Sequence, residues 1–206
     1  MNANESSTFK RGLIVVLSLL FILTLSAMII SPVVLGGEEF ELWMLIVNTF
    51  LISIPLGLFY ALIGILGMAI YRHRQHEQIN SRLAKLIYWG PRISGIAIVA
   101  FMSLFAFDVF EEGTLAEMLL AFLMHMLPMI ILAVVLAIAW RWPWVGAVAF
   151  GLAALALSAL TLSNGIQGLS TFLIIGAPLL MIALLFGANA RWKQEIDSAR
   201  RLALQP

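Results

Sequence analysis

The chain has 206 residues, of which 62% are hydrophobic and only 11% are charged, and its mean hydropathy is +1.02. Soluble domains are about half apolar and about a quarter charged, so this chain has too few charged residues to cover a soluble core. The net charge is +1, without a long basic run typical of a nucleic-acid-binding protein, and no cysteine is available for disulfides or thiolate-bound metals. An integral membrane protein is the class that remains.

Six long apolar stretches follow one another along the chain. They cover residues 12–35, 42–71, 93–110, 115–139, 144–162 and 169–190. A membrane-spanning helix needs about 20 apolar residues, with a range of about 17–25. The first stretch is longer than the apolar part of a signal peptide, so we expect an uncleaved helix. The sequence therefore predicts an all-α membrane protein, a bundle of six transmembrane helices.

Three prolines lie well inside these stretches, namely Pro55, Pro128 and Pro178, and each is expected to bend its helix. The stretch 144–162 is rich in small residues, with Ala147, Gly151, Ala154 and Ser158 forming one stripe at helical spacing. Small residues allow two helices in lipid to approach closely. This stretch is therefore predicted to be a central packing helix rather than part of a ligand path.

The basic residues determine the predicted orientation. With six spans, all 12 Lys and Arg residues fall on one side of the membrane: Lys10, Arg11, Arg72, Arg74, Arg82, Lys85, Arg92, Arg141, Arg191, Lys193, Arg200 and Arg201. The opposite side receives seven acidic residues and no basic one: Glu38, Glu39, Glu41, Asp108, Glu111, Glu112 and Glu117. Positive residues are retained in the cytoplasm during membrane insertion. Both termini are therefore predicted to be cytoplasmic.

We divide the chain into a two-helix transmembrane hairpin (1–71), a cytoplasmic amphipathic connector (72–91), a four-helix transmembrane unit (92–192) and a cytoplasmic tail (193–206). In the connector, Ile79, Leu83, Leu86 and Ile87 recur at helical spacing. With basic residues beside it, this stripe predicts a helix that lies along the inner headgroups. A helix that docks a partner is an alternative with the same spacing.

A candidate polar pocket centres on His125, the only histidine within a predicted span, because ionisable residues inside a membrane are functional candidates. Asp108, Glu111 and Glu112 precede it on the outer side, and Asn48 lies at a comparable depth in the second span. Such a pocket could relay protons or bind a divalent metal. In the simpler interpretation the acids are solvated and His125 is hydrogen-bonded to a neighbouring helix. We assign no cofactor and no metal site.

Residues 88–192 carry three motifs: 105–110 (FAFDVF), 125–128 (HMLP) and 139–146 (AWRWPWVG). On these motifs the stretch resembles an uncharacterised family of small prokaryotic four-helix integral membrane domains. The resemblance implies a four-helix unit in a prokaryotic cytoplasmic (inner) membrane, with the first two helices as an addition. It implies no catalytic role.

Three functions are compatible with this sequence. The first interpretation is a non-enzymatic, transporter-like or permease-associated subunit, which would act as a homo-oligomer or within a membrane complex, in contact with the lipid bilayer and not with nucleic acid. The second is an intramembrane enzyme acting on a lipid or quinone through His125 and the outer carboxylates. The third is a structural or assembly factor whose working surface is the connector.

Overall fold

The computed structural model describes residues 3–36, 41–75, 79–110, 114–161, 163 and 165–202. All the regular elements in these residues are helices. They are α1 (Ala3–Gly36), α2 (Leu42–Arg74), α3 (Ser81–Leu104), the 3₁₀ helix η1 (Phe105–Phe110), α4 (Leu115–Arg141), α5 (Pro143–Thr161), α6 (Gly165–Thr171), the π-helix η3 (Phe172–Gly176), α7 (Ala177–Arg191) and α8 (Lys193–Leu202). Six helices in the described residues are long and apolar enough to cross a membrane, which confirms the predicted bundle of six transmembrane helices.

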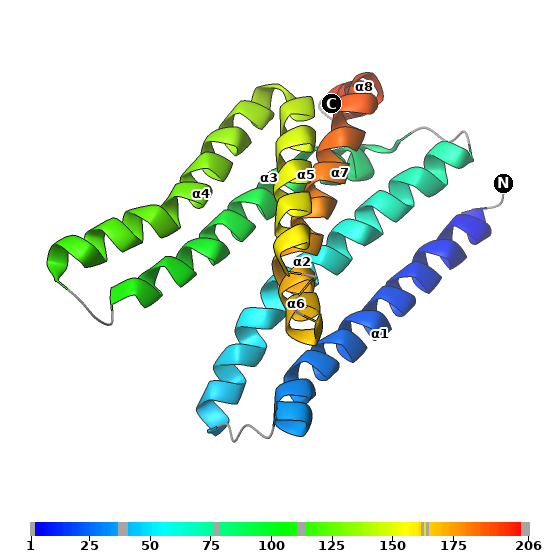
Figure 1. Cartoon of the computed structure of the whole chain (residues 1–206). Helices are drawn as coiled ribbons and strands as arrows, with labels where there is room; N and C mark the ends of the chain where they lie inside the picture. The colour runs from blue at the N-terminus through cyan, green and yellow to red at the C-terminus, as the bar shows by residue number, and fades with distance from the viewer. Residues whose placement is uncertain are drawn as a thin grey trace.

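The helices run up and down between two ends of the molecule (Figure 1). The start of α1, the end of α2, the start of α3, the turn from α4 to α5, and helix α8 lie at one end. This end, with the helix ends that reach it, carries all 12 Lys and Arg residues. We name the half of the bundle next to it the basic half and the other half the acidic half.

Helix α7 lies at the centre of the bundle, where it packs against α5, α3 and α2. The contact with α5 is the most extensive, as the small residues of α5 predict. Gly146 shows how close this contact is, because a Cβ atom added there would lie 2.8 Å from the Phe186 ring of α7. The same atom would lie 2.7 Å from Ala139 Cβ of α4. Helix α1 packs mainly on α2, and α4 packs on α5, α3 and η1. The two helices form the flanks of the bundle in Figure 1.

The buried side chains gather in the basic half. In α2 they begin at Pro55, in α4 they begin at Leu132, and in α5 they end at Ala154. The acidic-half part of α4, residues 115–131, contains no buried residue. The described residues of the acidic half include fewer buried ones, among them Met28, Ala106, Gly168 and Gly176. Along the membrane normal, the protein core therefore lies mainly in the basic half, and we call it the one-sided core.

The three intramembrane prolines lie close to the point where this core ends. Pro55 and Pro128 lie inside α2 and α4, and both helices change direction near their middle in Figure 1. At Pro178 the ladder of hydrogen bonds slips by one residue, because the Ala177 N–H donates to the carbonyl of Phe172, five residues back. Proline has no N–H to donate, so a bend or a wide turn is the physical consequence. Helix α2 packs against this π-helical turn.

The connector differs from the sequence-based expectation. Helix α3 runs from Ser81 through Pro91 without a break, so the predicted border between residues 91 and 92 falls inside a helix. The side chains of Ile79, Leu83 and Ile87 are buried against α2 and α8, whereas that of Leu86 is exposed. Helix α8, in the predicted tail, packs on α3 through Ile196. Most of the stripe is thus covered by protein, and not by lipid headgroups.

Candidate functional site

His125 lies on the outer surface of α4 and not inside the bundle of one chain. Its side chain is exposed, and Nδ1 lies 2.9 Å from the carbonyl oxygen of Ala121 in the same helix. A carbonyl can only accept, so Nδ1 is the donor in this hydrogen bond. Asn48 is exposed on α2, which packs against α1, α3, α7 and η3, whereas α4 packs on α3, η1 and α5. The two helices share α3 as a packing partner but do not pack extensively on each other, so no direct contact of α2 with α4 brings His125 and Asn48 together.

The carboxylates of the predicted pocket are only partly placed. Asp108 lies in η1, but its side chain, like all of Glu111 and Glu112, is outside the described residues. Among the described residues, no three His, Cys, Asp or Glu side chains gather as a metal site. Glu117 is a helix cap, since it and Thr114 form a capping box at the start of α4. The shared pocket thus stays a prediction.

A different polar cluster, which we name the Arg92 cluster, lies in the basic half. It consists of Tyr88 and Arg92 of α3, Trp140 of α4, Phe186 and Asn189 of α7, and Arg200 of α8. Arg92 is 1% exposed. Its guanidinium donates to the carbonyl oxygen of Tyr88 and, at 3.2 Å, to that of Trp140. The carbonyl of Trp140 lies in the last turn of α4, where no N–H group of the helix donates to it. Arg92 supplies the missing donor.

Aromatic rings surround the Arg92 guanidinium. Its Cζ atom lies 3.8 Å from the Tyr88 ring centroid, 5.7 Å from that of Phe186 and 5.9 Å from that of Trp140. The Cζ atom of Arg200 lies 3.7 Å from the Tyr88 ring centroid. Cations within about 6 Å of an aromatic ring are attracted to its face. The cluster therefore holds two cations against shared aromatic rings and connects α3, α4, α7 and α8.

Asn189 forms a hydrogen bond with a backbone carbonyl that Pro91 leaves without a donor in α3. Without an N–H, Pro91 leaves the carbonyl of Ile87 without its donor four residues further along the helix. The side chain of Asn189, which is 3% exposed, donates from Nδ2 to this carbonyl oxygen at 3.3 Å. An unsatisfied carbonyl would be costly in this buried region, so the bond fixes α7 against α3.

The Arg92 cluster was not predicted from the sequence. Arg92 entered the prediction only as one of the basic residues of one side, and Asn189 had no predicted role. One signal was available, because Asn189 is the only Asn, Gln or charged residue in the stretch 169–190. Polar residues in a span often bond to a neighbouring helix. The partner, a carbonyl freed by a proline on another helix, required the fold.

The comparisons with known proteins match only a family of unknown function. The sequence model of a family described as "Domain of unknown function (DUF7670)" matches residues 80–200. The match begins at the residue that caps α3, ends inside α8 and includes the whole Arg92 cluster. Helices α1 and α2 lie outside it. No curated protein and no solved structure matches the chain.

Proposed function

We propose that this chain, which belongs to the DUF7670 family, is a non-enzymatic, transporter-like or permease-associated subunit that works within a membrane assembly. The observation that carries the proposal is the one-sided core. The basic half is packed as a unit and held by the Arg92 cluster, whereas the acidic-half surfaces of α2 and α4 have few protein neighbours in one chain.

Packing in the basic half gives the subunit a rigid base. Helices in lipid associate through close packing and interhelical hydrogen bonds, and both are concentrated here. Phe150 and Phe186 stack with ring centroids 5.9 Å apart, and Gly95 lies against Leu136. A subunit with such a base can present its other half to a partner without losing its fold.

The proline bends supply the point at which the two halves can move relative to each other. Prolines and π-helical turns are the usual origins of bends in helices. In α2 and in the α6–η3–α7 helix the interruptions lie on contacting elements, so a change of angle in one would be passed to the other. Interrupted membrane helices that line a moving interface are a feature of transporters.

A photo-crosslinking experiment in native membranes tests the proposal. A crosslinking amino acid replaces Leu123 in the acidic half of α4 or, as a matched control, Val134 in the basic half of the same helix. The two positions are equally open in one chain, at 59% and 54% exposed. We expect a discrete protein adduct from position 123 and lipid adducts only from position 134. The mass of the adduct distinguishes a second copy of this chain from another membrane protein. Lipid adducts alone at both positions would contradict the proposal.

We further propose that both termini are cytoplasmic and that the membrane is the inner membrane of a prokaryote. The location of every Lys and Arg at one end supports this orientation, because positive residues stay inside. Reporter fusions after Leu35, Tyr71, Phe110, Trp142 and Asn164 should report outside, inside, outside, inside and outside in that order. The reverse pattern would place both termini outside the cell.

A further inference from the structure

A groove lies on the surface of the basic half between α1, α2 and the start of α3. Its volume is about 610 Å³, within the range of about 300–1,000 Å³ that is usual for small-molecule sites. Helix α1 borders it from Lys10 to Ile22, and α3 contributes Leu83 and Leu86. The site is separate from the Arg92 cluster and from the acidic-half surfaces discussed above.

Small residues of α2 line part of the groove. Gly57, Ala61 and Gly64 lie at positions i, i+4 and i+7, so they share one face of the helix. A Cβ atom added at Gly64 would lie 3.3 Å from Leu17 Cδ1 of α1. A hydrogen bond of 2.6 Å between the hydroxyl groups of Tyr60 and Thr24 joins the same two helices. Helix α1 is thus held beside α2, and small residues form one face of α2 along the groove.

The groove opens to the membrane and has the length of one lipid leaflet. Ile14 and Ile22 on its border are 54% and 57% exposed. The distance from Lys10 to Ile22 is twelve residues, or about 18 Å along a helix. One leaflet of a bilayer core is about 15 Å thick, half of the usual hydrocarbon thickness. A single acyl chain would therefore run along the groove from the basic end toward the middle of the membrane.

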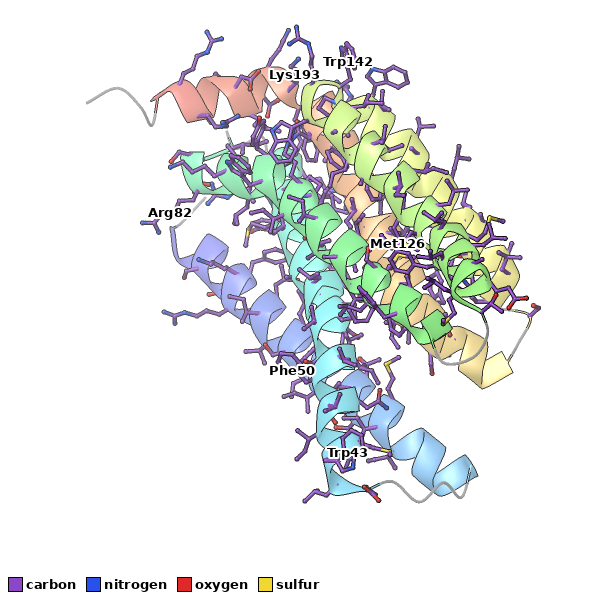
Figure 2. All side chains as sticks on the ribbon, turned by 90° about the vertical axis from the view of Figure 1, so that its left-hand side faces the viewer. Trp43, Phe50, Arg82, Met126, Trp142 and Lys193 are labelled. Atoms are coloured by element: carbon purple, nitrogen blue, oxygen red, sulfur yellow. The ribbon has the colours of Figure 1, made fainter. Side chains whose placement is uncertain are left out.

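The charge at the end of the groove favours an anionic headgroup. Lys10 lines the groove at the basic end, and the described residues that line it include no acidic side chain. Arg82 and Lys85 are exposed beside Leu83 and Leu86, and Figure 2 shows Arg82 toward the basic end of the molecule. A lipid phosphate at the basic end of the groove would thus have positively charged side chains near it.

From these features we propose that the groove is a binding site for one anionic phospholipid. One of its acyl chains lies between α1 and α2, and its phosphate lies at Lys10 with Arg82 and Lys85 around it. The apolar floor provides affinity for the chain, and the cations provide selectivity for the headgroup. Since α1 has few other contacts, the bound lipid also fills the space between α1 and the start of α3.

Native mass spectrometry of the purified full chain, incubated with equal amounts of phosphatidylglycerol and phosphatidylcholine, tests the proposal. We expect preferential retention of phosphatidylglycerol. Lys10→Gln should lower this preference about fivefold, because one basic residue near an anionic headgroup contributes about 1 kcal/mol. Ala61→Phe, or Ala61→Leu if the larger side chain prevents folding, should lower the retention of both lipids, since Ala61 is exposed inside the groove.

Two matched variants are the controls. Arg141→Gln removes an exposed charge at the same end, and Ala156→Phe enlarges an exposed alanine of α5, both outside the groove. Neither should change lipid retention. The proposal is overturned if the wild-type chain retains both lipids equally, if Lys10→Gln behaves like Arg141→Gln, or if Ala61→Phe behaves like Ala156→Phe. If the wild-type chain retains both lipids equally but Ala61→Phe lowers the retention of both, the groove binds an acyl chain without selecting the headgroup.

Discussion

The basic and acidic halves of the bundle are built from the same kind of residue but are packed differently. Phe150 in the basic half of α5 is 0% exposed, whereas Phe50 in the acidic half of α2 is 65% exposed. Both lie in membrane-crossing helices of similar hydropathy. Lipid covers an apolar side chain as well as protein does, so apolar residues in a span are not drawn together by hydrophobicity. Close packing and polar bonds decide where a core forms.

A second contrast separates the family-matched part of the chain from the preceding hairpin. Of the 18 most apolar consecutive residues in each span, 44% are buried in the span formed by α6, η3 and α7, and 6% are buried in α1. Arg92 donates a hydrogen bond to α4 and Asn189 donates one to α3, so both bonds join helices of the matched part. Thr24 of α1 is hydrogen-bonded to Tyr60 of α2. The matched residues 80–200 thus contain the hydrogen bonds that join α3 to α4 and to α7.

The largest difference between the two halves is expected from a matched pair of phenylalanine truncations. Phe150→Ala should lower the free energy of unfolding by about 3 kcal/mol, the lower end of the soluble-protein range, because lipid in the unfolded reference state removes part of the transfer term. Phe50→Ala should change it by less than about 0.5 kcal/mol. Unfolding in mixed micelles, followed by circular dichroism or steric trapping, measures both. Equal losses would mean that the acidic half is packed too.

Adding one methyl group should distinguish the centre of the bundle from its periphery. Gly146→Ala would place Cβ 2.7 Å from Ala139 Cβ, so we expect a loss of about 1–3 kcal/mol through overpacking. Gly12→Ala in α1 meets no atom within 4 Å and should be neutral or should stabilise the helix by up to about 1 kcal/mol. The same unfolding assay applies. A stable Gly146→Ala variant would show that α5 is not in close contact with Ala139 of α4 and Phe186 of α7.

A double-mutant cycle tests the interpretation of Asn189 as the partner of a carbonyl freed by Pro91. Asn189→Leu should cost about 1 kcal/mol, the usual size of an interhelical hydrogen bond in a membrane. In a Pro91→Ala background the new N–H of residue 91 can donate to Ile87, so Asn189→Leu should cost less there. Unfolding free energies of the four proteins give the coupling. Additive effects would assign Asn189 a packing role only.

The fold could be predicted from the sequence because membrane helices are encoded by long apolar stretches. All six spans were located, and small residues correctly identified α5 as a packing helix. The burial of Ile79, Leu83 and Ile87 was missed, since an amphipathic stripe has the same spacing whether lipid or α8 covers it. The Arg92 cluster was missed because its partners are backbone carbonyls, which every sequence contains. Long-range polar pairs of this kind become visible only in the folded chain.

The smallest effect is expected at His125, where the prediction of a polar pocket can be tested without a known activity. His125 lies ten residues after Leu115, about 15 Å along the helix and thus near the middle of a bilayer core. With its side chain exposed in one chain, a spin label at position 125 should be accessible to oxygen, which is concentrated in lipid. A label at Thr114, at the exposed end of α4, should instead be accessible to a water-soluble nickel chelate.

The pocket hypothesis gives the opposite result at position 125. A water-filled pocket with Asp108, Glu111, Glu112 and Asn48 would admit the nickel chelate to position 125 about as well as to position 114. The variants His125→Gln and His125→Leu provide an independent measurement. A side chain that faces lipid and bonds only to Ala121 should tolerate both changes within about 0.5 kcal/mol of the free energy of unfolding. A pocket residue that accepts a hydrogen bond from another helix should tolerate Gln better than Leu. Nickel access together with a selective loss in His125→Leu would establish the pocket and reopen the hypothesis of an intramembrane enzyme.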